Sequence, residues 1–371
     1  MERLQIALFL FFILGFGLWH LVSLDKDFSA HENRPLQTLP NFSLTSIKNG
    51  NFMDQFESYV ADQFPKRNSF LALKGITERA GQKKENNDIL FGQDGYLFEA
   101  FTMNQGQAFE NIEAINEFAG NNESLDIGFM LAPTSISIYP ERAPRYSPSD
   151  NEIGAIKEIY GELDPQIHSI SVAEALVNQK DHPIYFRTDH HWTMLGAYEA
   201  YALAADIFDF DPQSLEDFVR EQVSDNFYGS FYSKANDWRI EPDVMEYLRP
   251  EEEVKVHVSY DDGSEADSLV WPEALSSRDQ YRYFLGGNYG LVKIETDIKN
   301  GKRLLVVKDS YAHVLVPFFT HHYEEIHMVD LRYFREQIGK YADREDIDDL
   351  LIIYNIANFV DDKTLRRISY D

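Results

Sequence analysis

Short apolar runs alternate with helical segments along the carboxyl-terminal part of this chain. The runs of strand character are Leu304–Val307, Ile326–Val329 and Leu350–Tyr354. One helix is expected to start at Ser310 and another to lie near Arg335–Tyr341. Strands that alternate with helices form a parallel sheet with helices on both faces. The chain is therefore predicted to contain an α/β domain.

The same alternation occurs earlier and extends the predicted domain to residues 96–371. The expected elements are helix Gln107–Gly120, strand Ile127–Leu131, helix Asn151–Leu163, short strand Ile184–Phe186 and a helix capped by Thr193. Residues 209–299 are rich in Asp, Glu, Tyr and turn residues, so we predict an irregular insertion that walls the site. A chain of 371 residues can hold one sizeable domain of this kind with attachments.

The first 24 residues form an apolar segment of a different kind. Its polar residues after Arg3 are Gln5, His20 and Ser23. Roughly 20 residues are needed to span a bilayer as a helix, so its length suffices. A cleaved signal peptide is the alternative, although its apolar region is shorter and small residues mark its cleavage site. We predict an uncleaved signal anchor over 1–24, a single-pass cell-membrane anchor with the main domain extracytoplasmic.

Residues 25–95 are predicted to connect this anchor to the domain. Ser29–Pro40 is polar, contains two prolines and is typical of a tether. Asn41–Gln82 shows helical spacing of its apolar residues, and Pro65 is expected to divide it into two helices. The region is therefore predicted to be a tether followed by a helical juxtamembrane segment.

The charge of the chain excludes some classes of partner. The 62 acidic and 34 basic residues give a net charge of −28, which repels phosphate backbones and argues against nucleic-acid binding. The chain contains no cysteine, so neither a disulfide framework nor thiolate chemistry is expected. A domain of this size can be exported without disulfides because its core is large enough.

Asp189 and His191 lie two residues apart just before the helix that Thr193 caps. In an extended chain residues i and i+2 point to one side, so Asp189 could orient His191 while His190 points away. An Asp that orients a His forms two thirds of a nucleophilic site, since the imidazole titrates near ~6.5 and can carry a serine proton. The alternative is a loop whose polar residues only cap the following helix.

Ser310 offers the missing nucleophile. It follows the apolar run Leu304–Val307 at the start of an expected helix. Catalytic groups of open α/β sheets gather at the carboxyl ends of the strands, and an N–H at a helix start can stabilise an oxyanion. A simple helix cap by Asp309 or Ser310 is the alternative.

A metal site is the rival interpretation of Asp189, His190 and His191. Zinc sites usually take histidine pairs at helical spacing, and adjacent histidines point in opposite directions in an extended chain. His313, His321, His322 and His327 crowd one region, but no His-Glu-x-x-His motif occurs. We therefore expect neither a metal ion nor a cofactor.

A group of aromatic residues lies within the insertion: Tyr228, Phe231, Tyr232 and Trp238. Flat rings that line a groove suit the faces of sugars, because they bury apolar CH surface. A small satellite core beneath the insertion would use the same residues, so both interpretations stay open.

Two motifs of the chain resemble a known family. Thr188-Asp189-His190-His191-Trp192-Thr193, followed by Gly196-Ala197-Tyr198 and later by Lys308-Asp309-Ser310-Tyr311-Ala312, resembles the DHHW family of Gram-positive bacteria. That family is similar to the SGNH-hydrolase-like domains of the alginate O-acetylation proteins. The resemblance implies a circularly permuted SGNH fold, in which Asp and His precede Ser in the chain.

The resemblance also implies roles for individual residues. Ser310 is the implied nucleophile, His191 the base and Asp189 the residue that orients it. Asn355, which follows the strand Leu350–Tyr354, is the implied oxyanion donor, with Asn358 as the alternative. Further candidates for oxyanion or substrate contacts are Tyr311, Trp192 and Arg332. Lys308 stands where ordinary SGNH enzymes have the Gly of Gly-Asp-Ser, which leaves the oxyanion donors undefined.

The function implied is that of a membrane-anchored, extracytoplasmic serine O-acetyltransferase or acetylesterase acting on a cell-envelope polysaccharide. A multi-pass membrane acyltransferase that supplies the acyl group is the implied partner. The alternative is a non-catalytic glycan-binding or scaffold protein of the cell envelope on the same fold.

Overall fold

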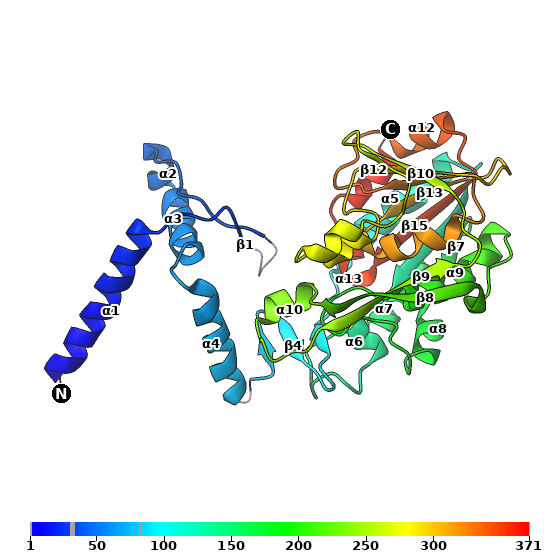
Figure 1. Cartoon of the computed structure of the whole chain (residues 1–371). Coiled ribbons are helices and arrows are strands. Elements are labelled where there is room, and N and C mark those ends of the chain that lie inside the picture. Colours follow the sequence, from blue (N-terminus) through cyan, green and yellow to red (C-terminus); the bar gives the residue numbers. More distant parts are fainter. Residues whose placement is uncertain (1, 30–33, 82, 371) are drawn as a thin grey trace. The chain divides into compact units, whose positions relative to one another are not determined.

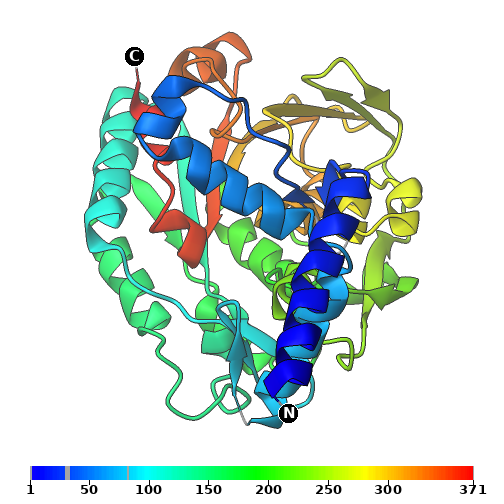
Figure 2. The same ribbon diagram turned by 90° about the vertical axis from the view of Figure 1, so that its left-hand side faces the viewer.

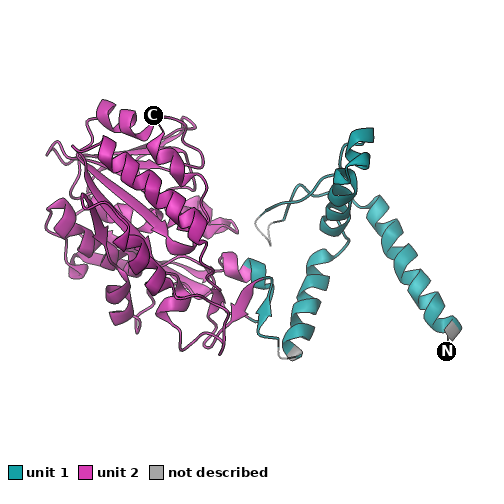
Figure 3. Cartoon of the chain, turned by 180° about the vertical axis from the view of Figure 1, so that it is seen from behind, with its two compact units in different colours: residues 1–87, 233–239 teal, residues 88–232, 240–371 magenta. Residues whose placement is uncertain are grey.

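The computed structural model describes residues 2–29, 34–81 and 83–370, which form two compact units (Figure 3). Unit 1 comprises Met1–Asn87 and Ser233–Arg239, and unit 2 comprises Asp88–Tyr232 and Ile240–Asp371. Part of the predicted tether, residues 30–33, lies outside the described residues. The short segment 233–239 belongs to unit 1 because it packs there, for example through the ion pair of Asp237 with Arg79.

Unit 1 begins with helix α1 (Glu2–Val22), the dark blue helix of Figure 1. Its residues Arg3–Val22 are long and apolar enough to cross a membrane, since about 20 residues span a bilayer. A signal sequence at the amino terminus has the same length and composition. The helix therefore fits either a membrane anchor or a signal sequence.

Three more helices follow in unit 1: α2 (Leu44–Lys48), α3 (Asn51–Asp62) and α4 (Arg67–Ala80). Pro65 lies between α3 and α4, which confirms the predicted break. Phe64 and Phe70 lie against Phe16 of α1, with ring centroids 5.4 and 5.5 Å apart.

Unit 2 is built on an eight-stranded sheet of order β11-β10-β12-β14-β13-β15-β6-β7. Five adjacent strands run parallel: β14 (Glu325–Val329), β13 (Arg303–Lys308), β15 (Asp349–Asn355), β6 (Asp126–Ala132) and β7 (Ile167–Ile170). In the register of the central strands Val306 lies between Met328 and Leu351. The predicted α/β class with a mostly parallel sheet is confirmed.

The prediction that residues 209–299 are irregular is wrong. This region supplies β12 (Leu291–Thr296), β10 (Val256–Tyr260) and β11 (Glu265–Ala266), which join the main sheet as antiparallel strands. It also forms the hairpin of β8 (Phe218–Phe227) and β9 (Asp243–Pro250). Along β10 and β12 buried residues alternate with more exposed ones, as in strands with one covered face.

Helices cover both faces of the sheet (Figures 1 and 2). Along β13, Leu304 and Val306 belong to one hydrophobic core, and Leu305 and Val307 belong to the other. The first core contains helices α8 (Ala173–Asn178), α9 (Met194–Phe208) and α11 (Val316–Phe319). The second contains α5 (Gln105–Asn121), α7 (Glu152–Gly161), α12 (Ile338–Arg344) and α13 (Ile356–Phe359). The red carboxyl-terminal segment lies beside α5 in Figure 2, where Asn111 donates to the carbonyls of Phe359 and Asp362.

The remaining elements are short. They are β1 (Phe28–Ser29), β2 (Arg34–Pro35), β3 (Glu85–Asn86), β4 (Ile89–Phe91), β5 (Leu97–Glu99), α6 (Ser135–Ile138), η1 (Leu215–Asp217), α10 (Ser230–Ala235), η2 (Pro272–Ser276), η3 (Gln280–Tyr283) and η5 (Leu365–Ser369). The predicted strand Ile184–Phe186 is an isolated bridge of Tyr185 with Trp192. The helix expected from Ser310 is a 3₁₀ turn, η4 (Ser310–Val314), followed by α11.

Asp349, the first residue of β15, is a buried carboxyl whose effect on stability can be measured. Burial raises the pKa of its carboxyl to about 6, while the Tyr323 hydroxyl donates to it at 2.7 Å. A carboxyl whose pKa is higher in the folded state stabilises folding below its ordinary pKa and loses that contribution as the pH rises through about 6. Asp349→Asn is therefore expected to stabilise the protein by about 1–2 kcal/mol at pH 7 and to have little effect at pH 4. Denaturant unfolding at the two pH values measures this, and an equal change at both contradicts the account.

Candidate active site

The candidate site lies at the carboxyl ends of the central parallel strands. β13 ends at Lys308, and the chain continues through Asp309 into the turn η4 that Ser310 begins. His191 comes to the same edge from the loop that precedes α9. Catalytic and ligand-binding groups of open α/β sheets gather at this edge because the strands end there side by side.

Asp189, His191 and Ser310 lie in one hydrogen-bonded series. Ser310 Oγ lies 2.7 Å from His191 Nε2, and His191 Nδ1 lies 2.5 Å from Asp189 Oδ1. The predicted contact between His191 and Ser310, 119 residues apart in sequence, is therefore present. In this arrangement the carboxylate can hold the imidazole tautomer that leaves Nε2 free to accept the serine proton.

Asp189 is almost fully enclosed and yet held as an anion. Oδ1 accepts hydrogen bonds from the backbone N–H and the ring of His191, and Oδ2 accepts the Ser230 N–H at 2.6 Å. Burial opposes the charge on Asp189. The neighbouring His190 and His191, together with these hydrogen bonds, outweigh burial and hold its pKa well below the usual range.

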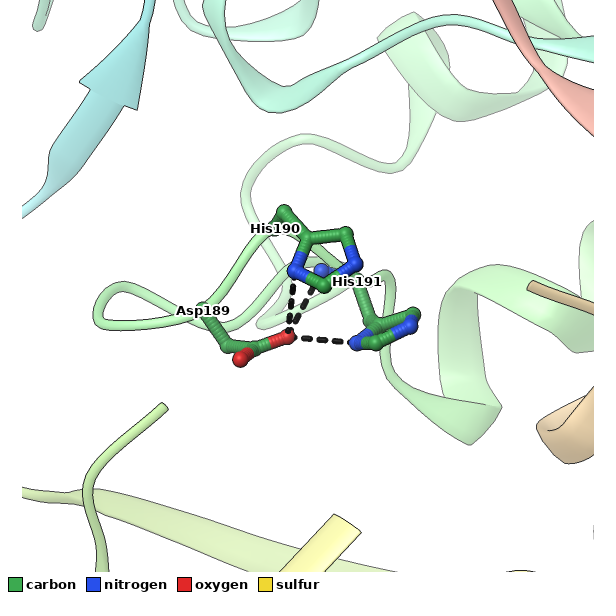
Figure 4. Close-up of side chains that lie close together, drawn as sticks. All are labelled: Asp189, His190 and His191. Atoms are coloured by element: carbon green, nitrogen blue, oxygen red, sulfur yellow. Dashed lines mark hydrogen bonds and ion pairs between the residues drawn. The ribbon is translucent and has the colours of Figure 1, made fainter. Parts of the chain in front are cut away.

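His190 does not point away from Asp189, contrary to the prediction. The ring centroids of His190 and His191 are 3.7 Å apart, and His190 Nδ1 lies 3.4 Å from Asp189 Oδ1 (Figure 4). The same nitrogen is 2.7 Å from Ser230 Oγ. The prediction failed because residues 187–191 form a bent loop, in which the alternation of an extended strand does not apply.

The bent loop also weakens the sequence argument against a metal ion. One ligand atom each of Asp189, His190 and His191 lies within 4.8 Å of the others. These atoms nevertheless have protein partners, because His191 pairs with Asp189 and His190 pairs with Ser230. A zinc ion bound here would replace the hydrogen bond that joins Asp189 to His191.

Gly229 allows the Asp189 carboxylate to lie against the chain that follows β8. A Cβ at position 229 would meet Asp189 Cβ at 2.2 Å and Oδ2 at 2.3 Å. Real Cβ atoms do not approach other atoms this closely, so no other residue fits.

Gly229→Ala is expected to displace Asp189 and to lower both activity and stability. The added methyl group forces the carboxylate away from His191 Nδ1, so we expect a loss of at least about tenfold in kcat and a lower Tm. Gly120→Ala is a matched control, because nothing lies within 4 Å of a Cβ at this helical position. Equal activity of the two variants would show that the Asp189 position is not critical.

Asp243 of β9 holds the loop in place and was not recognised in the sequence. Its carboxylate accepts the N–H groups of Arg187 and Thr188, the Thr188 hydroxyl and the Arg187 guanidinium. The Thr188 hydroxyl in turn accepts the Gly229 N–H at 3.1 Å. Asp243 lies 54 residues beyond Asp189 in the chain, and only the hairpin of β8 and β9 brings it to the loop.

Tyr281 is a second residue that the sequence did not reveal. Its ring stacks on His191, with centroids 3.7 Å apart and planes at 8°, and its hydroxyl donates to the Ser310 carbonyl at 3.2 Å. Tyr281 lies on η3, within the predicted insertion. This part of the insertion therefore lines the site, as predicted.

Trp192 and Tyr311 are buried supports of the site. Both side chains have 0% exposed surface, and their oxyanion or substrate roles stay predictions. The Trp192 indole N–H donates to the Tyr311 carbonyl at 3.0 Å, and the Tyr311 hydroxyl donates to the His190 carbonyl. These two bonds tie the histidine loop to the turn that carries Ser310.

The contacts of Asn355 are those of a helix cap. Its side-chain oxygen accepts the N–H groups of Ala357 and Asn358, and so caps α13. Its side chain also bonds to Tyr311. The alternative candidate, Asn358, donates to Asp309 Oδ2 at 2.7 Å. No described contact joins either amide to Ser310, and their oxyanion roles stay predictions.

Arg332 lies at the end of β14 beside a buried cationic group. Its guanidinium binds both oxygens of Asp330, at 2.9 and 2.6 Å, and this pairing raises the pKa of Arg332. Asp330 also lies 3.8 Å from the ammonium of Lys308, which is almost fully buried. The Arg332 side chain is 41% exposed, so a substrate contact is sterically open and stays a prediction.

The four aromatic residues of the insertion are divided between the two units. Phe231 is buried, and Trp238 is exposed and belongs to unit 1. Tyr228 and Tyr232 pack together, with ring centroids 4.3 Å apart, and Arg278 lies over both rings. The sugar-binding groove and the satellite core both stay predictions.

Comparison with known proteins identifies related chains. The model of the family described as DHHW protein matches residues 86–329. A DHHW family protein from Eubacterium siraeum DSM 15702 has a TM-score of 0.67 and 26% identity, over 76% of this chain and 95% of that chain. Bacillus cereus PatB1 with a sulfonyl adduct has a TM-score of 0.65 and 19% identity, over 76% of this chain and 98% of that chain. No curated protein matches the chain.

Proposed function

The chain belongs to the DHHW family, and we propose that it is a serine O-acetyltransferase or acetylesterase that acts on a cell-envelope polysaccharide. The observation that carries the proposal is the pair of contacts of His191, at 2.7 Å to Ser310 Oγ and at 2.5 Å to Asp189 Oδ1. A hydroxyl next to an imidazole that is oriented by a buried carboxylate is the arrangement of an activated serine nucleophile.

In the proposed reaction Ser310 Oγ attacks the carbonyl carbon of an acetyl donor while His191 Nε2 takes the hydroxyl proton. Asp189 stabilises the imidazolium that forms. The tetrahedral intermediate collapses, and the leaving group takes the proton from His191. A sugar hydroxyl or water then repeats the sequence on the acyl-enzyme, which separates transferase from esterase activity.

The finer fold assignment is part of this proposal. We infer a circularly permuted SGNH-hydrolase-like domain, because Asp189 and His191 precede Ser310 in the chain and the three meet at the carboxyl ends of the strands. PatB1 supports the fold, and its sulfonyl adduct suggests a chemical probe for this chain as well.

The proposed location is extracytoplasmic, with α1 as an uncleaved anchor. We divide the chain into an anchor (1–24), a tether and helical segment (25–95) and the SGNH-like domain (96–371). The apolar length of α1 and its position at the amino terminus support the anchor. The proposed partner is a multi-pass membrane acyltransferase that supplies the acetyl group, and a net charge of −28 makes nucleic acid an unsuitable partner.

The proposal is tested with the full-length chain in detergent micelles and 4-nitrophenyl acetate as acetyl donor. Release of 4-nitrophenol above the rate of His191→Ala is expected, with a further increase when an oligosaccharide acceptor is added if the chain is a transferase. Equal rates for both proteins would favour the non-catalytic glycan-binding or scaffold protein.

The cluster of Asp189, His190 and His191 also permits a metal-dependent site, which makes a different prediction. If the hydrogen bonds of these residues are the functional state, EDTA is expected to leave kcat unchanged, and excess Zn²⁺ is expected to inhibit by displacing Asp189 from His191. Loss of activity on chelation that is restored by Zn²⁺ would support the metal site instead.

A further inference from the structure

The turn that carries Ser310 holds a second side chain with no assigned role. His313 follows Ser310 by three residues on η4, and a 3₁₀ helix has three residues per turn. The two side chains therefore leave the turn on the same side. The His313 ring also lies 6.1 Å from Tyr281, the ring that stacks on His191.

The contact of His313 with Lys308 defines which of its nitrogens carries hydrogen. Lys308 Nζ lies 2.8 Å from His313 Nε2, and both side chains are almost fully buried. The Asp330 carboxylate, 3.8 Å from Lys308 Nζ, favours the ammonium form, although burial lowers the pKa of Lys308 to about 8. An ammonium can only donate, so Nε2 is the acceptor and the hydrogen of the neutral ring is on Nδ1.

A neutral His313 is consistent with its surroundings. Burial, and then the charge of Lys308, lower the pKa of His313 well below its ordinary value. The other charged groups that act on the ring are His191 and Arg332. The ring therefore presents one N–H group, at Nδ1.

That N–H group has no hydrogen-bond partner among the residues that the structure describes. Buried polar groups are normally paired, because an unpaired donor loses its bond to water without replacing it. A chain that keeps such a donor on the turn that begins at Ser310 carries a cost that an apolar side chain would avoid. Exceptions of this kind are concentrated at functional sites.

We propose that the His313 Nδ1–H donates a hydrogen bond to the carbonyl oxygen of the acyl group that reacts with Ser310. The inference rests on the proposed function and supplies the donor that Asn355, which caps α13, does not visibly provide. As the Ser310 Oγ–carbon bond forms, the electron pair of the C=O bond moves to oxygen and His191 takes the serine proton. His313 stabilises the oxyanion without transferring its hydrogen.

Two conservative variants separate the two nitrogens of His313. His313→Gln can keep an acceptor near Nε2 for Lys308 but lacks the donor at Nδ1. His313→Asn can keep a donor near Nδ1 but lacks the acceptor for Lys308. We expect the Gln variant to lose about 10²-fold in kcat for 4-nitrophenyl acetate with KM unchanged. The Asn variant is expected to stay within about tenfold of the wild-type kcat and to have a lower Tm.

The measurement uses the full-length chain in detergent, with circular dichroism and a thermal melt for each variant. ¹⁵N NMR of histidine-labelled protein, assigned by comparison with the Gln variant, gives the tautomer of His313 independently of activity. A Gln variant that keeps wild-type kcat, an Asn variant that loses as much kcat as the Gln variant, or an Nε2–H tautomer each overturns the inference. Failure of the proposed function gives a different result, because the wild-type chain itself would not hydrolyse 4-nitrophenyl acetate. That result would overturn the proposed function and the role of His313 together.

Discussion

Replacing Ser310 with alanine is expected to lower kcat for 4-nitrophenyl acetate by about 10⁴–10⁶-fold, to the level of the uncatalysed reaction plus any contribution of binding. The Ser310 hydroxyl oxygen is the atom that forms the acyl-enzyme bond in the proposed reaction. The missing hydroxyl leaves His191 Nε2 without the partner that it has at 2.7 Å. KM should change little, because the lost interaction acts in the transition state.

The Tm of Ser310→Ala shows whether the variant is folded. A second serine variant shows whether the effect is specific to Ser310. Ser58 is exposed on α3, and among the described residues its hydroxyl bonds only to the carbonyl of Asp54 one turn earlier, so Ser58→Ala should keep wild-type kcat. Residual activity of Ser310→Ala above a tenth of wild type would mean that another group is the nucleophile. The variant therefore tests whether the Ser310 hydroxyl is the nucleophile.

Asp189→Asn is expected to lower kcat by about 10⁴-fold, although it changes the size of the side chain very little. Asp189 accepts hydrogen bonds on both oxygens, from His191 on one side and from the Ser230 N–H on the other. An amide has one oxygen, so its NH₂ group must face a donor on one of the two sides. If it faces His191, the ring takes the opposite tautomer and Nε2 carries a hydrogen toward Ser310.

The pH dependence of kcat gives a second measurement of the role of Asp189. The pKa of Asp189 is held well below its ordinary value, so its stabilising charge is present above that value and is lost only when the pH falls through the lowered pKa. Asp189 should therefore stay ionised throughout a profile from pH 5 to pH 9.

The matched control for Asp189→Asn is Asp349→Asn. Asp349 is a buried carboxylate at the opposite end of β15, and its replacement should keep wild-type kcat. Asp189→Asn with kcat within tenfold of wild type would contradict the assigned role.

The parallel part of the sheet was predictable from sequence because its strands are covered on both faces. Buried runs such as Leu304–Val307 and Leu350–Tyr354 are continuous and apolar, and they stand out between helical segments. β10 and β12 were missed because polar residues alternate along them, as with His257 and Ser259. Ile184–Phe186 has the composition of a strand, but its residues pack into the core as part of a loop.

The site was predictable only where chemistry and local sequence coincide. Asp189 and His191 are close in sequence and follow a predicted short strand, and Ser310 follows the run Leu304–Val307. The pair and the serine could therefore each be placed at a strand end. Tyr281, Asp243 and His313 carry no such signal, since each acquires its role from a contact between distant segments. The direction of His190 was predicted wrongly because the geometry of a bent loop depends on Asp243 and Gly229, which only the folded chain brings to it.

The most direct test of a serine nucleophile is chemical labelling of the full-length chain with phenylmethylsulfonyl fluoride, followed by peptide mass spectrometry. The sulfonyl group should be found on Ser310, because this hydroxyl lies against the free nitrogen of a histidine held by Asp189. The label should be absent in His191→Ala and greatly slowed in Asp189→Asn. Labelling of a different residue, or no labelling of a chain that hydrolyses 4-nitrophenyl acetate, would contradict the assignment of Ser310.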